Sequence, residues 1–242
     1  RILGCLSLVI ATFAHGACDR ESLTVVSHNA LAYAGHPNTV FATDAAIVDA
    51  AVEFYAEHEP DILVIQEAPP EKHIRRVAKK LGLEYRWFES GYAGDATYPY
   101  GFPGAILSRW PFLEATDYNR AGPAKPDSLF QRFLGVVLVD APFGKIRVIG
   151  THLCADWGGE FRERTRLREL AFIEDSVDMS HEDPIVLFAA DFNFQPNTPP
   201  YHKVLEMGFA DTAPPVNIPG TVPVPDSKVK IDHIFFKGSR LS

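Results

Sequence analysis

Six polar side chains stand where short apolar runs of the sequence come to an end. They comprise three carboxylates, two amides and one imidazole: Glu67, Asp191, Asp232, Asn29, Asn193 and His152. One acid after a strand commonly caps a helix or a turn. Six polar residues at several strand ends indicate an assembled site, because sites are built where loops and strand ends meet at one edge of a scaffold.

The residue types favour one kind of chemistry. Carboxylates and amides offer hard oxygen ligands, which suit Mg²⁺ or Mn²⁺ with water completing the shell better than they suit zinc. His152 can donate to a phosphate oxygen or carry a proton. A metal, carboxylates and a histidine together predict in-line attack of water on a phosphoryl group.

The elements that must position these residues follow from the apolar pattern. Compact apolar or β-branched runs predict strands, and apolar residues at helical spacing predict helices. The strands are expected at 23–27, 62–65, 105–107, 184–188 and 229–236, with an antiparallel pair at 133–139 and 146–149, and the helices at 45–56 and 162–177. Strands mixed with helices, some of them hairpin-connected, predict an α+β or layered α/β protein with two sheets packed face to face.

Five segments carry a resemblance to a known family. They are ILVIQE (62–67), GAILSRWPF (104–112), VIGTHL (148–153), AADFN (189–193) and KIDHIFF (230–236). In this order they resemble the endonuclease/exonuclease/phosphatase superfamily, which includes DNase-like nucleases, abasic-site endonucleases, neutral sphingomyelinases and inositol-polyphosphate phosphatases. The resemblance implies a four-layer sandwich of two central, mostly antiparallel β-sheets flanked by helices. It leaves the subgroup open.

The resemblance also implies roles for the six residues and a divalent cofactor, Mg²⁺ or Mn²⁺. Glu67 resembles the principal metal ligand, with Asn29 beside it. Asp191 resembles the acid that orients or deprotonates the attacking water. The remaining three resemble a phosphate-contacting amide (Asn193), a phosphate-binding group that stabilises the transition state (His152) and an acid near the metal or the leaving group (Asp232).

Two departures from the family pattern occur. Ala190 stands where the family usually has Gly before DFN. The family also closes with a Ser-Asp-His motif and one more strand, whereas this sequence ends at Ser242, and His233 lies inside the IDHIF segment. The first residue is Arg1 rather than Met. We therefore expect a fragment whose domain lacks its last strand.

The N-terminus predicts a targeting segment. A positive start, a short apolar stretch and small residues around Ala17 are typical of a secretory signal peptide over residues 1–17, which leaves a single domain at 18–242 in a secreted or periplasmic protein. A first core strand or helix is the alternative, and lipid anchoring at Cys18 is a lesser one. Cys18 and Cys154 could pair in an oxidising compartment.

The amino-acid composition restricts the class of protein but does not identify a substrate. The 242 residues are 46% hydrophobic and 22% charged, with a formal net charge of -8, which suits one globular core and argues against a protein that coats nucleic acid. We expect a monomer without a transmembrane span that hydrolyses phosphate esters. The acidic balance mildly favours a small or lipid substrate over nucleic acid. A secreted nuclease and a non-catalytic binding module remain alternatives. Carbohydrate hydrolysis by paired carboxylates would leave the asparagines unexplained.

Two basic features and one aromatic group each allow two interpretations. Arg132 could contact the substrate phosphate, although an arginine entering a strand is more often part of a surface ion pair. The alternating arginines and glutamates of residues 160–169 read as a solvated helix face with ion pairs. Tyr98, Tyr100 and Phe102 could form an aromatic wall, but a packed loop is the favoured interpretation.

Overall fold

The fold is a layered arrangement of two β-sheets with helices outside. The computed structural model describes residues 7–14, 22–33, 45–92, 94, 101–120, 129–155, 159–179, 185–213, 220–221 and 228–238. One sheet has the order β1 (Ser7–Ala14), β2 (Ser22–Asn29), β3 (Ile62–Gln66), β5 (Gly104–Ser108) and β4 (Glu84–Phe88). The other has the order β10 (Ala210–Asp211), β11 (Asp232–Lys237), β9 (Ile185–Asp191), β8 (Gly144–His152), β7 (Leu134–Ala141) and β6 (Phe112–Asp117).

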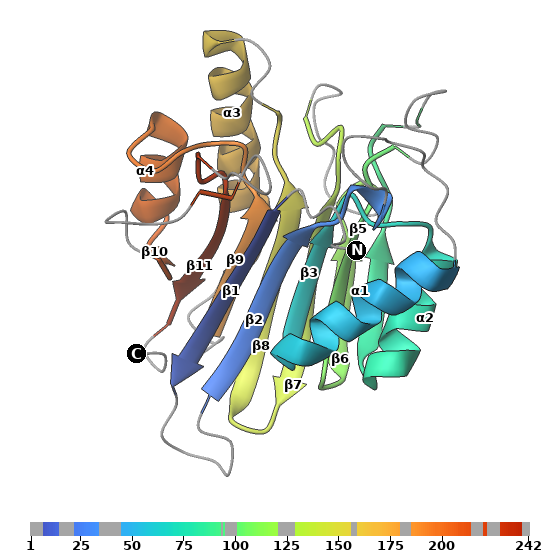
Figure 1. The fold of residues 1–242 in the computed structure, drawn as a ribbon. Helices are drawn as coiled ribbons and strands as arrows, with labels where there is room; N and C mark the ends of the chain where they lie inside the picture. The colour runs from blue at the N-terminus through green and yellow to red at the C-terminus, as the bar shows by residue number, and fades with distance from the viewer. Residues whose placement is uncertain are drawn as a thin grey trace.

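Most neighbouring strands run antiparallel, as the family resemblance implies. Among the described strands the parallel pairs are β2 with β3 and β8 with β9, one near the middle of each sheet. Helices α1 (Ala45–His58) and α2 (Glu71–Leu81) lie over the five-stranded sheet, whereas α3 (Glu160–Ser176) and α4 (Pro199–Glu206) lie on the side of the six-stranded sheet (Figure 1). A short 3-10 helix, Leu31–Tyr33, follows β2.

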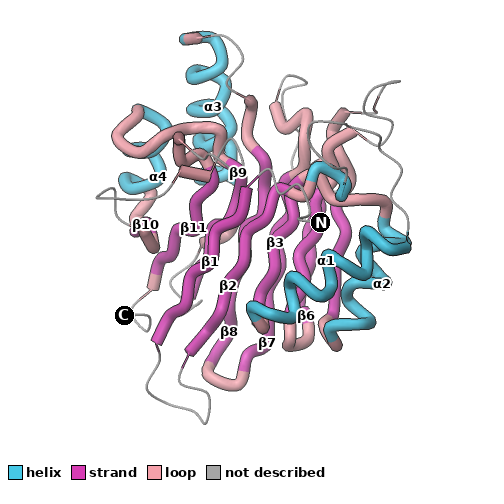
Figure 2. The backbone as a smooth tube through the Cα atoms, in the orientation of Figure 1, coloured by secondary structure: helices cyan, strands magenta, loops and turns pink. Residues whose placement is uncertain are grey.

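Alternation along the strands builds three apolar layers. Side chains of a strand point to opposite faces in turn, so Val25 lies in the cluster between the two sheets and Val26 lies in the cluster beneath α1 and α2. In the same way Val148 faces the other sheet and Ile149 faces α3 and α4. Each sheet is therefore apolar on both faces, which explains the continuous hydrophobic runs in the sequence, and Figure 2 shows the strands stacked between the outer helices.

The predicted strands and helices are present, with one correction at the C-terminal end. The sequence predicts a strand running through 229–236, but β11 begins at Asp232 itself, and Val229 lies outside it, with its carbonyl accepting a hydrogen bond from the Thr221 backbone N–H. Asp232 therefore begins a strand instead of following one. Because β11 runs antiparallel to β9, this start lies at the same edge as the end of β9.

The segment predicted as a signal peptide contributes a strand in this structure. β1 pairs antiparallel with β2 along its whole length, from Ser7 opposite Asn29 to Ala14 opposite Ser22. This is the arrangement that the alternative of a first strand describes, while removal of residues 1–17 stays a prediction. Cys18 lies outside the described residues, and none of the described helices is long and apolar enough to cross a membrane.

Candidate active site

Strand pairing brings five of the six predicted residues to one edge of the two sheets. Asn29 ends β2 and Glu67 directly follows β3, and these two strands are parallel neighbours. In the other sheet His152 ends β8 opposite Asp191, which ends β9, and Asp232 begins β11 opposite the same Asp191. The ends of parallel strands coincide at one edge, so positions far apart in the sequence become neighbours.

The side chains meet across the gap between the sheets. The Asn29 amide donates to Glu67 Oε1 at 3.3 Å and to Asp191 Oδ2 at 3.0 Å, and its own carbonyl oxygen accepts from the Leu31 backbone N–H at 3.2 Å. His152 Nε2 lies 3.3 Å from Asp191 Oδ2, and its Nδ1 lies 3.7 Å from Glu67 Oε1. One amide thus connects two carboxylates that belong to different sheets, and the imidazole lies beside both of them.

The Leu153 carbonyl ties two further predicted residues to this cluster. It accepts hydrogen bonds from Asn193 Nδ2 at 3.1 Å and from Arg132 Nη1 at 2.9 Å. The Asn193 backbone N–H donates to Asp191 Oδ1 at 3.0 Å, so this oxygen is held by Asn193 while Oδ2 is held by Asn29. Arg132 therefore lies beside the site. Its hydrogen bond goes to a backbone carbonyl instead of to the surface carboxylate that the alternative interpretation would require.

Two site residues adopt a backbone conformation that most side chains avoid. Glu67 has φ +46° and Asn193 has φ +53°. Asparagine tolerates this left-handed region, but for glutamate it costs on the order of 1 kcal/mol or more, and such outliers cluster at functional sites. The neighbouring backbone holds the turn, since the Glu67 carbonyl accepts from the Ala32 N–H at 2.6 Å and the Ala68 N–H donates to the Pro103 carbonyl at 2.9 Å.

Burial shifts the protonation of the cluster. It raises the pKa of Glu67 to about 7, an effect that the Arg132 charge opposes and the Asp191 charge reinforces. It also raises the pKa of Asp191, against the hydrogen bond from Asn29 and the charge of Arg132. For His152 burial and the Arg132 charge both lower the pKa, well below its usual range, so the imidazole is neutral at pH 7.

These residues suit a hard divalent cation. Asp191 is buried and Glu67 is half-buried, one amide joins the two carboxylates, and their burial disfavours the negative charge unless a cation is close. Within the described ranges no three His, Cys, Asp or Glu side chains are arranged to hold a metal by themselves. Mg²⁺ characteristically takes one or two carboxylates and keeps several waters and substrate oxygens, and the donor set fits that pattern.

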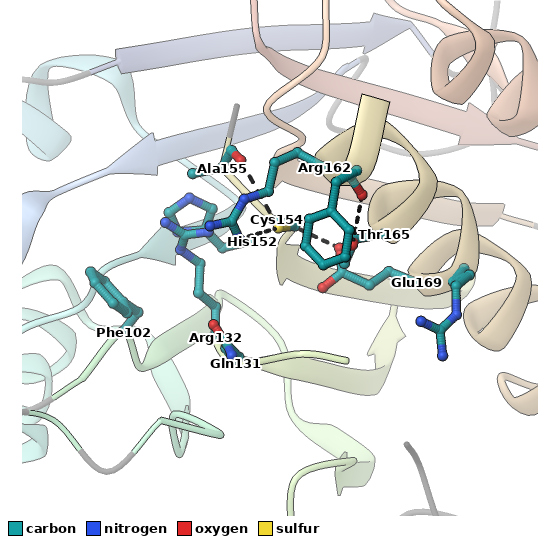
Figure 3. A pocket seen from close by; sticks show the side chains of 11 residues that line it. Phe102, Gln131, Arg132, His152, Cys154, Ala155, Arg162, Thr165 and Glu169 are labelled. Carbon is teal, nitrogen blue, oxygen red and sulfur yellow. Dashed lines mark hydrogen bonds between the residues drawn. The ribbon is translucent and has the colours of Figure 1, made fainter. Parts of the chain in front are cut away.

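A pocket of about 390 Å³ opens beside His152 (Figure 3). Its lining residues come from three segments: Phe102; Gln131 and Arg132; and the stretch from His152 through the first turns of α3, with Cys154, Ala155, Phe161, Arg162, Thr165, Arg168 and Glu169. The pocket therefore shares His152 and Arg132 with the carboxylate cluster.

The structure corrects the interpretation of residues 160–169 as a solvated helix face. Arg166 and Glu169 are buried. Glu169 accepts from the Phe130 N–H at 3.2 Å and from the Cys154 N–H at 2.9 Å, and Arg166 donates to the Cys154 carbonyl at 3.1 Å. The charged pattern gave no signal of this, because the buried acid holds backbone groups of distant loops.

Glu169 and Phe102 also line the pocket. Burial raises the pKa of Glu169 to about 7, although the Cys154 and Phe130 backbone hydrogen bonds and nearby arginines oppose the rise. Phe102 lies under the Arg132 guanidinium, 4.9 Å from it, whereas Tyr98 and Tyr100 lie outside the described residues.

Comparison with known proteins decides the family. The model of the Endonuclease/Exonuclease/phosphatase family matches residues 40–242. The chain belongs to this family. A search of curated proteins gave no match.

Several solved structures share the fold at low sequence identity. Humanized TDP2 from D. rerio is 19% identical, with a TM-score of 0.59 over 90% of this chain and 84% of that one. The beta toxin of Staphylococcus aureus, as a β-hairpin deletion mutant, is 17% identical with a TM-score of 0.60 over 88% and 85%. The 3′ phosphatase NExo from Neisseria, bound to a product DNA hairpin, is 18% identical with a TM-score of 0.56 over 80% and 82%. These likenesses confirm the sandwich fold for the family member described here.

Proposed function

We propose that this family member is a divalent-metal-dependent hydrolase of phosphate esters that acts by in-line attack of water. Its family takes its name from nucleases and phosphatases, and one structural relative is a 3′ phosphatase. Hydrolysis of a phosphoester bond is the chemistry these proteins share. The metal requirement and the roles below are inferred from the residues at the site.

One observation carries the proposal. The Asn29 amide donates to both Glu67 and Asp191, which lie 38 and 162 positions away in the sequence, and His152 contacts the same Asp191 oxygen. A buried carboxylate, a half-buried one, an amide and a neutral imidazole in one cluster serve no packing purpose that apolar residues would not serve better. A site for a cation and a phosphate explains why all four are there.

The site residues would then hold the metal and accept the proton of the attacking water. Glu67 and Asn29 would hold the metal, which when bound polarises the phosphate and lowers the pKa of water. Asp191 Oδ2 would take the proton of the attacking water, since burial raises its pKa towards that of a useful base. Its position is fixed by the hydrogen bonds from Asn29 and from the Asn193 backbone.

The remaining groups face the phosphate and the leaving group. Asn193 gives one amide hydrogen to the Leu153 carbonyl and keeps the other for a phosphate oxygen. A neutral His152 can donate one hydrogen bond to the phosphate and stabilise charge that develops in the transition state. Asp232 lies opposite Asp191 in the strand register, where it can assist the leaving group, and Arg132 supplies positive charge beside the phosphate.

The substrate class stays open between nucleic acid, phospholipid and inositol phosphate. One relative was solved with a single-strand DNA product and another with a DNA hairpin, which favours a nuclease or a nucleic-acid phosphatase. The acidic net charge of -8 favours a smaller substrate. Secretion to the cell exterior or the periplasm, and action as a monomer, belong to the same proposal.

Hydrolysis of bis-p-nitrophenyl phosphate tests the proposal. Protein stripped with EDTA should be inactive and should regain activity on titration with MgCl₂ or MnCl₂. We expect Glu67→Ala to lower kcat/KM at least about a hundredfold, since a bound metal contributes several kcal/mol of transition-state stabilisation. Glu57→Ala, at an exposed glutamate of α1, is the matched control and should leave the rate unchanged.

Equal rates for Glu67→Ala and the parent protein, or full activity in EDTA, would contradict the proposal. Plasmid DNA, sphingomyelin and inositol phosphates, assayed under the conditions that restore activity, then identify the substrate class.

A further inference from the structure

The pocket beside His152 has a composition that the hydrolysis of a single phosphate does not require. Three of its lining residues are arginines: Arg132, Arg162 and Arg168. Figure 3 shows the Arg132 and Arg162 side chains reaching from different walls of the pocket towards His152. A cluster of cations in an acidic chain requires an explanation, because like charges repel unless an anion lies between them.

The described surroundings do not neutralise Arg162 and Arg168, whereas Arg132 lies close enough to Glu67, Asp191 and Glu169 for its charge to oppose the rise in their pKa. Among the described residues no carboxylate forms a salt bridge with Arg132, Arg162 or Arg168, and Glu169 is the only carboxylate on the described lining of the pocket. Both Glu169 oxygens already accept from backbone N–H groups, and burial raises the pKa of Glu169 to about 7, so the carboxyl group is only partly ionised at pH 7.

The guanidinium donors are only weakly engaged by the protein. Arg162 donates to the Cys154 sulfur at 3.3 Å, and a thiol sulfur is a poor acceptor. Arg132 gives one hydrogen bond to the Leu153 carbonyl and lies over the Phe102 ring. The remaining N–H groups on both sides of the pocket are donors for a ligand, and guanidinium groups bind phosphate through paired hydrogen bonds.

The apolar part of the lining fits a ligand with a flat or hydrocarbon body. Phe161 is 64% exposed at the start of α3, an unusual position for a large apolar side chain, and Phe102 also lines the pocket. A volume of about 390 Å³ is in the range of small-ligand sites.

We propose that this pocket binds a second phosphate group of the substrate, with Arg162 and Arg168 as its ligands and Phe161 against the group that links the two phosphates. The inference rests on the proposed function, since His152 and Arg132 place the pocket next to the reacting phosphate. Substrates with two phosphates include nucleic-acid ends and small polyols with several phosphates. Both present the same chemistry to the arginines.

Equilibrium binding in EDTA tests the pocket without any turnover. Isothermal titration calorimetry compares thymidine 3′,5′-bisphosphate with thymidine 5′-monophosphate, and in a second arm inositol 1,4-bisphosphate with inositol 1-phosphate. We expect the parent protein to bind at least one bisphosphate about tenfold or more tightly than its monophosphate, as one charged hydrogen-bonded pair would give. The arm that shows the preference identifies the source of the second phosphate.

Variants of one helix assign the preference to the pocket. Arg162→Ala and Arg168→Ala should each bring the ratio of the two affinities close to one. Arg164→Ala removes the same charge from an exposed position of α3 that does not line the pocket, and it should keep the ratio. Circular dichroism checks that all three variants fold alike.

Three results would overturn the inference: equal affinities for mono- and bisphosphate in both arms, an unchanged ratio in Arg162→Ala and Arg168→Ala, or the same loss in Arg164→Ala. Because the titration needs no hydrolysis, failure of the pocket is distinguishable from failure of the proposed activity. A protein that hydrolyses bis-p-nitrophenyl phosphate without a bisphosphate preference lacks only the subsite.

Discussion

Replacing Glu67 by glutamine should stabilise the metal-free protein, and by more at high pH than at low pH. A glutamate in an unfolded chain titrates near 4.5, whereas burial raises the pKa of Glu67 to about 7 in the folded protein. The folded state therefore binds the proton more tightly than the unfolded state does. The stability that proton binding at Glu67 contributes is fully present below pH 4.5 and is lost as pH rises through 7.

The pKa difference sets the size of the effect. It corresponds to about 3 kcal/mol of unfolding free energy lost by the parent protein between pH 4.5 and pH 8. Glutamine cannot ionise, and its Oε1 can still accept from the Asn29 amide. In a chain of this size a difference of about 3 kcal/mol should raise the thermal midpoint by roughly 5 to 10 °C.

Differential scanning calorimetry in EDTA at pH 5 and pH 8 measures this effect. We expect Glu67→Gln and the parent protein to differ little at pH 5 and clearly at pH 8, while Glu57→Gln, at an exposed glutamate, changes neither midpoint. Added MgCl₂ should stabilise the parent protein at pH 8 and the Glu67→Gln variant much less, since a ligand stabilises the state that binds it. A Glu67→Gln variant that is less stable than its parent at pH 8 in EDTA would refute the reasoning.

Three further predictions concern catalysis and the core. Asn29→Ala should lower kcat/KM for bis-p-nitrophenyl phosphate at least about tenfold, because both carboxylates lose a charge-assisted hydrogen bond; an unchanged value would contradict this. In urea denaturation, Gly135→Ala should lower the free energy of unfolding by about 1 to 3 kcal/mol, since a Cβ there would lie 2.6 Å from the Phe88 ring; an unchanged free energy of unfolding would contradict this. Asp211→Ala should cost about 3 to 5 kcal/mol in the same assay, because the buried Lys230 loses its counter-ion, 3.0 Å away, and a loss below 1 kcal/mol would contradict it.

The sequence predicts the layered fold because each central strand is apolar on both faces. Runs such as 62–65 and 184–188 stand out for this reason, and residues 62–65 and 185–188 are strands in the structure. Edge strands give a weaker signal. β4 (Glu84–Phe88) alternates between exposed and partly buried residues and carries two charges, and β6 (Phe112–Asp117) is largely exposed, so neither is predicted.

The core of the candidate site is also predictable from sequence, since its members are polar residues that interrupt apolar strands. Glu67, His152 and Asp191 stand in short motifs, and strand pairing brings them together. Asp232 is found for the same reason, although it begins its strand. Which atoms meet, such as the single Asn29 amide between two carboxylates, depends on the spacing of the two sheets and cannot be read from the chain.

The pocket could not be predicted, because helix α3 is charged on every side. In a sequence, Arg162, Arg164 and Arg168 look equivalent, and only the packing of α3 against the six-stranded sheet separates pocket-lining positions from solvent-facing ones. Glu169 resembles a surface ion-pair partner for the same reason. Its role, accepting from two loop N–H groups, is a tertiary contact 15 and 39 positions away in the chain.

Hydrolysis of bis-p-nitrophenyl phosphate in ¹⁸O-labelled water, by the parent protein and by Asp191→Asn, tests the central claim most directly. Water attack at phosphorus predicts one labelled oxygen in the p-nitrophenyl phosphate product and none in the p-nitrophenol, with release only when MgCl₂ is present. Asp191→Asn keeps the shape of the side chain but removes the proton acceptor, and it should lower the rate about a hundredfold or more. Label in the p-nitrophenol, or an Asp191→Asn rate equal to that of the parent protein, would contradict the proposed site and its chemistry.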